Sequence, residues 1–295
     1  MLWMNPGEGK YIRCDYDQPV CPYRGVVTCD NEIYGLATDP DSIYLCKYNH
    51  VENKWEQKST VCKGCEKPGR PYLMEVDGHL FYVDEYPVVP VLKKYNQHKN
   101  EWQNCSTPDI GEFDCLFAVS CNQHIYLFTL AEMHWYDPRE DRWSKKALSV
   151  YSPKVELDFG MAGAMGTEIF WMDPGYSNML VYDTEADSWS EHPVPNFHVN
   201  PNIYVENGAF FVLQNKLHAI VDYDSPNQDD ELELFQEVFV YDRPEGVWRE
   251  SSELPFGRQC VYNSMNAVAR MYLPYLNTSQ ADTQDAANPE GPSGE

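Results

Sequence analysis

The sequence predicts an all-β fold, first from its composition and then from the spacing of two aromatic residue types. Of 295 residues, 14% are aromatic, among them 21 Tyr and 8 Trp, and the chain also contains 21 Pro and 17 Gly. Aromatic residues favour strands, while Pro and Gly favour turns, so we expect many short strands joined by tight turns. The sequence has no long stretch rich in Ala, Leu, Glu and Lys with a helical period.

The aromatic spacing recurs along the chain. A Tyr precedes a Trp by seven positions in five places, whereas random placement gives roughly 0.6 such pairs, so the spacing indicates an internal repeat. The pairs are Tyr48/Trp55, Tyr95/Trp102, Tyr136/Trp143, Tyr182/Trp189 and Tyr241/Trp248. Each Tyr is followed by Asn or Asp, whose side chains initiate turns by bonding the backbone two residues onward. Each pair therefore predicts a hairpin, with the Tyr ending one strand and the Trp on the next.

The repeat length predicts the architecture. Met4 and Tyr11 occupy the same two positions in a sixth copy, and successive Trp positions are 44, 47, 41, 46 and 59 residues apart. This is the length of a four-stranded propeller blade. A second family of hairpins lies between the first, pairing 26–29 with 33–36, 73–76 with 80–83, 116–119 with 125–128, 161–164 with 169–172, 210–213 with 217–220, and 260–262 with 268–273.

The repeat Tyr and Trp residues are expected to be structural. A side chain that recurs in every blade is better explained by packing between blades than by a cage for a ligand. We therefore expect all five Tyr/Trp pairs to pack between successive blades.

The two ends of the chain are expected to complete each other. Residues 1–14 contain only an outer hairpin, and residues 258–276 contain only an inner one. Joined, they would close a six-bladed β-propeller over residues 1–276, with five blades as the alternative. Closure removes exposed sheet edges, which otherwise promote aggregation. Residues 277–295, rich in Asp, Ala, Pro, Gly and Ser, are predicted to be a disordered acidic tail.

The repeat resembles the kelch repeat, whose apolar inner strands are followed by a Tyr and a Trp about seven residues apart. The resemblance covers residues 1–276 but lacks the double glycine of that family, since the equivalent stretches are Gly35–Thr38, Val83–Tyr86 and Met172–Gly175. It implies a propeller of the BTB–kelch family, divergent in its repeats. Such propellers recognise substrates for cullin-3 RING ubiquitin ligases, while BTB and BACK domains hold the cullin. No BTB or BACK sequence precedes the repeats here, so we expect this chain alone not to bind a cullin.

The resemblance also implies where partners bind, namely on the face formed by loops from second to third strands and from fourth strands to the next blade. The former loops are predicted at 39–42, 85–89, 130–132, 173–177 and 222–237. Tyr86, Tyr176 and Tyr223 are candidate apolar anchors, since loop side chains are free to contact a partner, although each is also explained as an ordinary surface residue.

The last of these loops is the most acidic. Residues 222–237 contain seven acidic residues and no basic one, including Asp229, Asp230 and Glu231. Two interpretations stay open: an acidic arm that engages a Lys/Arg-rich segment of a protein substrate, or a solvated, disordered insertion.

The charge and the cysteines restrict partners and location. A formal net charge of −24 repels phosphate backbones and anionic membrane surfaces, so neither nucleic acid nor membrane is an expected partner. The sequence has no secretory signal at its start and no apolar run long enough to span a membrane. We therefore expect a cytoplasmic protein whose ten cysteines are reduced.

We expect neither a metal, a cofactor nor catalysis. Cys62 and Cys65 have the spacing of a zinc knuckle, but a structural zinc site needs four ligands and no second pair with this spacing exists. Nucleophile-elbow, His-Glu-x-x-His and phosphate-loop motifs are missing from the sequence. The leading hypothesis is thus a substrate-recognition propeller of a ubiquitin-ligase adaptor. The alternatives are a kelch scaffold of cytoskeletal or trafficking function and, more remotely, a propeller enzyme.

Overall fold

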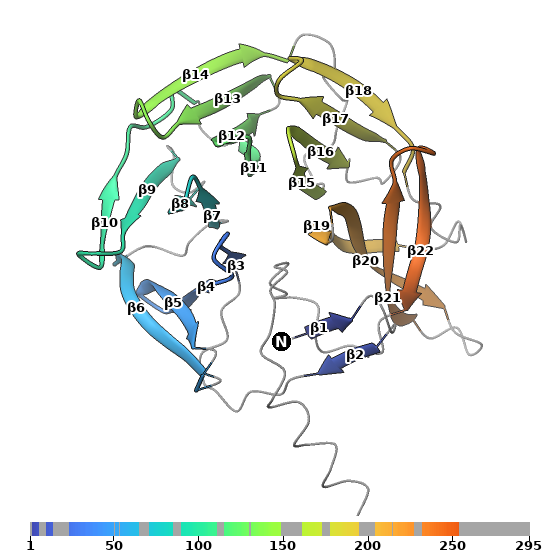
Figure 1. The fold of residues 1–295 in the computed structure, drawn as a ribbon, viewed down its shortest axis with the longest axis horizontal. Helices are drawn as coiled ribbons and strands as arrows, with labels where there is room; N and C mark the ends of the chain where they lie inside the picture. Colours follow the sequence, from blue (N-terminus) through green and yellow to red (C-terminus); the bar gives the residue numbers. More distant parts are fainter. Residues whose placement is uncertain are drawn as a thin grey trace, which may run out of the picture.

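The computed structural model shows an all-β ring of twisted sheets (Figure 1). It describes residues 2–5, 10–13, 24–49, 51–52, 54–64, 71–84, 90–110, 115–129, 131–148, 161–172, 178–194, 204–213, 215–226 and 232–253. Within these residues, five antiparallel sheets have four strands each, and a further sheet has two. The five sheets are arranged around a central axis as the blades of a propeller.

Each blade is a meander of four consecutive strands. The first blade contains β3 (Arg24–Val27), β4 (Ile33–Asp39), β5 (Ser42–Asn49) and β6 (Lys54–Lys63); the second, β7 (Tyr72–Val76), β8 (His79–Asp84), β9 (Val91–Asn96) and β10 (Glu101–Asn104). The third contains β11 (Cys115–Cys121), β12 (His124–Thr129), β13 (Glu132–Asp137) and β14 (Arg142–Ala147). The fourth contains β15 (Met161–Met165), β16 (Glu168–Met172), β17 (Met179–Asp183) and β18 (Ser188–His192); the fifth, β19 (Tyr204–Leu213), β20 (Lys216–Pro226), β21 (Leu232–Asp242) and β22 (Val247–Glu253).

The blade order follows the chain around the ring. The first strand of each blade is innermost and the fourth is outermost (Figure 1). Inner strands of successive blades lie against one another, β3 on β7, β7 on β11, β11 on β15, and β15 on β19. The predicted inner hairpins of these five blades correspond to the observed first and second strands, so the period of the sequence predicts their positions correctly.

The prediction of six four-stranded blades is wrong, because the residues that the structure describes form five. The predicted outer hairpin near the N-terminus does form, as β1 (Leu2–Asn5) and β2 (Lys10–Arg13), with Met4 opposite Tyr11. It is a two-stranded sheet between the fifth and first blades (Figure 1). The predicted inner hairpin at 258–276 and the tail at 277–295 lie outside the described residues. The error arose because periodicity predicts single hairpins, whereas joining two hairpins from opposite ends into one sheet requires long-range pairing that no local pattern encodes.

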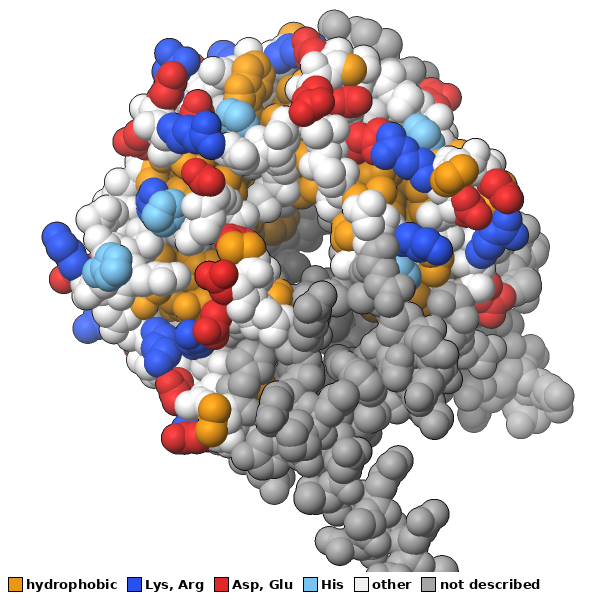
Figure 2. Space-filling view, in the orientation of Figure 1, with side chains coloured by type: hydrophobic (Ala, Val, Ile, Leu, Met, Phe, Trp, Pro, Cys, Tyr) orange, Lys and Arg blue, Asp and Glu red, His pale blue; other side chains and the backbone are white. Residues whose placement is uncertain are grey.

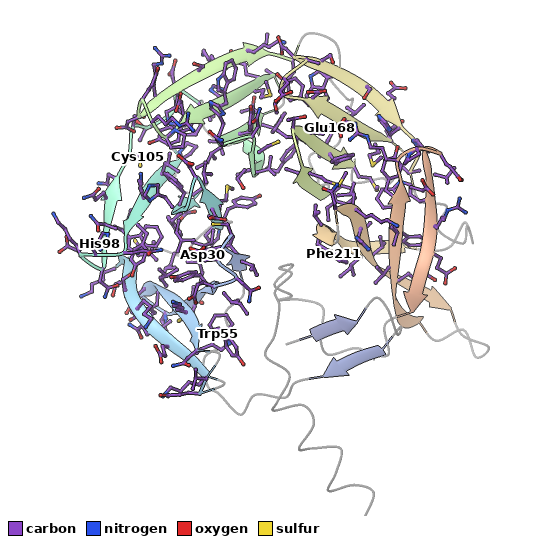
Figure 3. The ribbon with its side chains drawn as sticks, in the orientation of Figure 1. Asp30, Trp55, His98, Cys105, Glu168 and Phe211 are labelled. Carbon is purple, nitrogen blue, oxygen red and sulfur yellow. The ribbon has the colours of Figure 1, made fainter. Side chains whose placement is uncertain are left out.

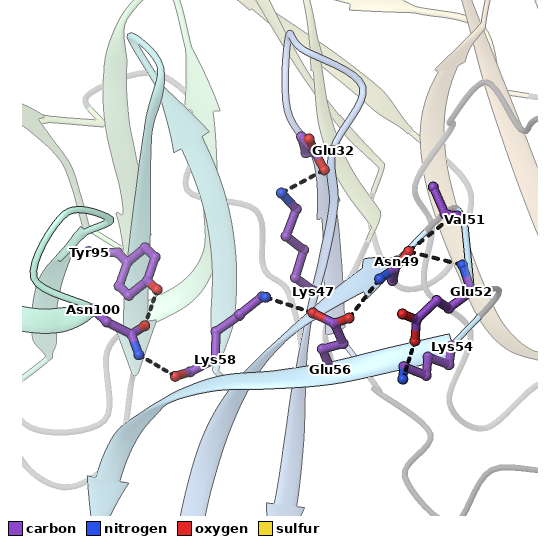
Figure 4. Close-up of polar contacts among 10 residues, drawn as sticks. All are labelled: Glu32, Lys47, Asn49, Val51, Glu52, Lys54, Glu56, Lys58, Tyr95 and Asn100. Atoms are coloured by element: carbon purple, nitrogen blue, oxygen red, sulfur yellow. Dashed lines mark hydrogen bonds and ion pairs between the residues drawn. The ribbon is translucent and has the colours of Figure 1, made fainter.

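The turn between the third and fourth strands has the same length in all five blades. It spans four residues in each case, at 50–53, 97–100, 138–141, 184–187 and 243–246. In four blades the Asn or Asp after the repeat Tyr accepts bonds from backbone amides two or three residues onward, as at Asn49, Asn96, Asp137 and Asp183 (Figure 4). These bonds satisfy backbone amides of the turn that have no backbone acceptor there.

A third position in this hairpin, five residues after the Tyr, links the second, third and fourth blades each to the one before it. Tyr95 donates its hydroxyl proton to Asn100, Tyr136 to Asp141 at 2.8 Å, and Tyr182 to Asp187 at 2.7 Å. The acceptor side chains also bond the preceding blade: Asn100 donates to the carbonyl of Lys58, Asp141 accepts from the Ser106 amide, and Asp187 accepts from Lys146. Asn100, Asp141 and Asp187 have positive φ values of 56°, 48° and 51°, a conformation that Asn, Asp and Gly tolerate best.

The repeat Trp forms a second link to the preceding blade. Trp102 Nε1 donates to Ser59 Oγ at 2.9 Å, Trp143 Nε1 to the Ser106 carbonyl at 2.8 Å, and Trp248 Nε1 to the Pro193 carbonyl at 2.8 Å. Each Trp ring also lies against its own Tyr, with ring centroids 5.0–5.5 Å apart in the five pairs. We call this arrangement of Tyr, the Asn or Asp five residues later, and Trp the blade clasp.

The fifth blade has a variant of the clasp. Gly246, with a φ of 65°, replaces the Asn or Asp, so the hairpin offers no side-chain acceptor at this position. The hydroxyl of Tyr241 instead lies 2.6 Å from Nδ1 of His192 in the fourth blade. The junction of these two blades is therefore held by a titratable pair.

The hydrophobic core is divided among the blade junctions. Four clusters of buried residues are present, and each combines side chains from two successive blades (Figure 3). The junction between the fourth and fifth blades is tight enough that a Cβ atom on Gly163 would lie 2.7 Å from Phe210 Cβ. Burial of apolar surface between sheets thus provides most of the attraction, while the clasp fixes their relative position.

The prediction that every repeat Trp packs between two blades stays a prediction for Trp55, because the side chains of β1 and β2, which precede it in the ring, are outside the described ones. Trp55 lies on β6 of the first blade, directly opposite Tyr48, and their rings meet edge to face with centroids 5.5 Å apart (Figure 3). It is only partly buried and belongs to none of the four clusters between blades. The other four repeat Trp do pack against these clusters: Trp102, Trp143, Trp189 and Trp248.

We predict that Trp102→Ala lowers the free energy of unfolding by about 3 kcal/mol, toward the low end for an aromatic residue because Trp102 is only partly buried. Trp189→Ala, in the corresponding position of the fourth blade, should have a similar effect. Chemical denaturation measures both. A melting temperature equal to that of the unsubstituted protein would contradict a role for these Trp residues in joining blades.

We also predict that Asp141→Ala is destabilising by about 3 kcal/mol, because it leaves the Tyr136 hydroxyl and the Ser106 amide without their acceptor and places a Cβ-bearing apolar residue at positive φ. Asp141→Asn is the matched control, since Asn100 fills this position in the second blade. Denaturant titration should show a clear difference between the variants, and equal stability would exclude the proposed role of the side chain.

Candidate protein-binding surface

The two faces of the ring differ in how uniform their connections are. On one face, which we call the turn face, all five turns between third and fourth strands have four residues, and four of the five turns between first and second strands have two (77–78, 122–123, 166–167 and 214–215). On the other, the loop face, connections between second and third strands span 40–41, 85–90, 130–131, 173–178 and 227–231. Connections to the next blade span 64–71, 105–114, 148–160 and 193–203. Length variation is therefore concentrated on the loop face.

Side chains on the turn face are engaged in contacts between blades. Arg139 Nη2 lies 3.8 Å from Asp77 Oδ2 across the second and third blades, and Asn122 Nδ2 donates to Thr184 Oγ1 at 3.2 Å across the third and fourth. Arg243 forms an ion pair with Glu168 across the fourth and fifth. Burial raises the pKa of the Glu168 carboxyl, whereas Arg243 opposes this shift. These side chains hold the ring together, so the turn face has fewer groups to offer a partner.

Of the six residues predicted from the sequence to contact a partner, the structure describes only Tyr223. Tyr86, Tyr176, Asp229, Asp230 and Glu231 fall outside the described residues. Tyr223 belongs to β20, where its backbone pairs with Val205 and Phe235. The predicted binding role of these six residues stays a prediction.

The first predicted loop, at 39–42, is a tight turn. Asp39 Oδ1 accepts a bond from the Asp41 amide at 3.1 Å, and Tyr44 donates to Asp39 Oδ2 at 2.5 Å. The Tyr44 hydroxyl lowers the pKa of the Asp39 carboxyl. These internal bonds leave the turn short and rigid.

The acidic segment at 222–237, predicted as a loop, is mostly a β-hairpin. The pairing of β20 with β21 continues through Asp222↔Gln236 to Pro226↔Leu232, leaving only 227–231 between the strands. A loop or a disordered insertion is therefore the wrong description of this segment. The sequence contains a physical reason, because Leu232, Leu234 and Phe235 have the β-propensity of a strand despite the surrounding carboxylates.

Charge is distributed unequally among the blades. Residues 24–148, which span the first three blades, contain 19 acidic and 14 basic residues, and their cations lie beside carboxylates, as in Lys54–Glu52, Lys58–Glu56, Arg142–Glu140 and Lys146–Asp187 (Figure 2). Residues 161–253, which span the last two, contain 18 acidic and three basic residues. Two of the three, Arg243 and Arg249, already form ion pairs. The fourth and fifth blades are therefore the anionic part of the ring.

Two polar side chains near the loop face were not predicted, although both stand two residues before a repeat Tyr. Lys93 donates to the Val61 carbonyl of the preceding blade at 2.8 Å, and burial lowers the pKa of its amine. His134, 2% exposed, has Nε2 3.2 Å from Glu132 Oε2, and Lys145 lies 3.4 Å from the same oxygen. Both residues are packed within the ring and act in its stability.

The cysteines require one correction. Cys62 is disulfide-bonded, with a partner outside the described side chains, so the expectation of fully reduced cysteines is wrong at this position. Cys29, Cys46, Cys105 and Cys121 are free thiols. Within the described part of the chain, no three His, Cys, Asp or Glu side chains are grouped as metal ligands, and no helix is long and apolar enough to cross a membrane.

Comparison with known proteins supports the fold. No protein-family model matches the sequence, and curated proteins give no match either. The solved structure of YjhT is similar, with a TM-score of 0.58 at 14% identity over 81% of this chain and 86% of that one. A protein from Lactobacillus plantarum has a TM-score of 0.54 at 10% identity, over 86% and 92% of the two chains. The chain is thus a β-propeller.

We predict that the protein loses stability as the pH falls below about 6.5. Burial lowers the pKa of His79, His134, His192 and His218 below that ordinary value. At pH values between the ordinary and the lowered pKa, these histidines are protonated in the unfolded chain but not in the native ring. Their contribution to the free energy of unfolding is therefore fully present above the ordinary pKa and is lost as the pH falls through this window. Glu168, with a raised pKa, contributes in the opposite direction.

Urea unfolding at pH 7.5 and 5.5 measures this dependence. The His134→Asn variant should show a smaller difference between the two pH values than the unsubstituted protein. Stability that is unchanged or higher at pH 5.5 would contradict the prediction.

Proposed function

We propose that this β-propeller is a protein-binding module that contacts its partners through the loop face. The observation that carries the proposal is a contrast in length between the two faces. On the turn face, all turns between third and fourth strands have four residues and four of the five between first and second strands have two, whereas connections on the loop face vary. A rigid scaffold with variable loops suits recognition, because the scaffold holds loop side chains in place without requiring them for folding. The inter-blade contacts of the turn face support the same choice.

More specifically, we propose a substrate-recognition propeller of the BTB–kelch type, acting in a cullin-3 RING ubiquitin ligase in which BTB and BACK domains hold the cullin. The recurring Tyr and Trp at kelch spacing support this assignment. The protein substrate is recognised by the loop face, and no cofactor, nucleic acid or membrane takes part. A scaffold for cytoskeletal or trafficking proteins is the alternative that the experiment below separates.

We predict that partners recovered from a lysate by the full chain depend on the loop face. In the test variant, residues 85–89 and 173–177, which include Tyr86 and Tyr176, are replaced by Gly-Ser linkers of equal length. In the control variant, the exposed turn-face residues Lys99 and Glu185 are changed to Ala. The loop variant should lose partners that the control retains, with equal melting temperatures. Retention of every partner by the loop variant would overturn the proposal.

The ligase assignment has its own readout. Ubiquitination of a loop-dependent partner should fall in cells in which this chain's gene is disrupted and return when it is restored. Unchanged ubiquitination, together with loop-dependent binding, would favour a scaffold and reject the adaptor role.

A further inference from the structure

The fifth blade has an unpaired strand edge. Strand β22 covers β21 only from Asp242 to Glu237, yet β21 continues to Leu232, still paired with β20 on its other side. Residues Leu232–Gln236, which we call the overhang edge, thus have no paired neighbour on their outer side among the strands that the structure describes. Alternate amides and carbonyls of such a strand point outward and can bond another chain.

This edge is particular to the fifth blade. In the first, third and fourth blades the fourth strand covers the third to its first residue, through Ser42↔Lys63, Glu132↔Ala147 and Met179↔His192. In the second blade only two residues of the third strand extend beyond the ladder, and the Cys105 amide bonds the carbonyl of one of them, Leu92, at 3.0 Å. Five uncovered residues, about 17 Å of strand, give room for an added strand of similar length.

The charge around the overhang edge selects what can pair with it. The hairpin segment 222–237 contains seven acidic residues and no basic one, and it belongs to the two blades with 18 acidic and three basic residues. A second copy of this edge would bring like charges opposite one another, which is unfavourable between paired strands. A strand carrying Lys and Arg would instead be attracted both on approach and once paired.

We propose that the overhang edge binds an extended, Lys/Arg-rich segment of a partner protein, which adds to β21 as a further strand. Backbone hydrogen bonds provide the attachment, and the carboxylates of the hairpin provide selection for basic side chains. This inference rests on the proposed protein-binding function and identifies the chemical class of the segment that is recognised.

Three synthetic ten-residue peptides test the mode of binding by fluorescence anisotropy with the full chain. One alternates Lys and Val, the second has the same sequence with every backbone amide N-methylated, which keeps the charge but removes the donors of a ladder, and the third alternates Glu and Val. The Lys-Val peptide should bind at least about tenfold more tightly than the other two and protect the outward amides of 232–236 from hydrogen exchange. Equal binding of the N-methylated peptide, or protection elsewhere, would overturn strand addition.

A matched pair of variants tests the location. The hairpin variant loses four carboxylate charges of segment 222–237, through Asp229→Asn, Asp230→Asn, Glu231→Gln and Glu233→Gln. The control variant loses four charges at exposed positions elsewhere, through Asp30→Asn, Glu101→Gln, Glu185→Gln and Glu191→Gln. The hairpin variant should lose about tenfold in affinity for the Lys-Val peptide, and the control less than twofold. Equal losses would show that only overall charge matters.

The outcome separates this inference from the proposed function. If the hairpin variant retains all cellular partners while the loop variant of 85–89 and 173–177 loses them, the overhang edge is not the binding element but the loop face still is. If neither variant loses a partner, the proposed function itself fails.

Discussion

The structure depends on how one blade is fixed to the next. Sheet faces bury apolar side chains between blades, but such packing is not directional and tolerates sliding. The blade clasp adds direction, because a buried Tyr hydroxyl, an Asn or Asp at positive φ and a Trp indole each have one geometry in which their bonds are satisfied. At the junction of the second and third blades, Asp141 and Trp143 both bond Ser106, and the Tyr136 hydroxyl donates to Asp141. The hairpins that carry the clasp therefore have one length.

This constraint explains why the connections on the two faces differ in how much their lengths vary. Turns that carry the clasp cannot lengthen without displacing the Asn or Asp from its bond to the preceding blade, so these turns have one length. Two loop-face connections begin with clasp partners, Ser106 and Pro193, but the connections as a whole differ in length from two residues at 40–41 to thirteen at 148–160. Binding groups can therefore be placed on the loop face at little cost to stability, which is the basis of the proposed function.

The sequence predicts the local part of this structure well. The Tyr and Trp spacing places ten aromatic residues directly opposite one another in five hairpins, and it even positions Met4 opposite Tyr11. The third member of the clasp was missed, although Asn or Asp stands five residues after the Tyr in four of the five pairs. Its signal was visible, but the partner it bonds lies in another blade, about 35 to 42 residues away.

The non-local features could not be predicted in the same way. The blade count failed because it required hairpins from both ends of the chain to pair, and no local pattern predicts such pairing. The acidic loop proved to be a hairpin because strand pairing outweighed the repulsion of its carboxylates. The residues proposed to bind partners, Tyr86 and Tyr176 among them, have no periodic signal, since loop residues are not repeated from blade to blade.

A double-mutant cycle between the first and second blades tests the clasp most directly. Trp102→Phe removes the donor, and Ser59→Ala the acceptor, of the hydrogen bond from Trp102 Nε1 to Ser59 Oγ. The two residues belong to different blades, so this bond joins the second blade to the first. If the clasp joins blades, unfolding free energies of the single and double variants should show a coupling of about 1 kcal/mol. Additive effects, with no coupling, would mean that packing alone positions the blades.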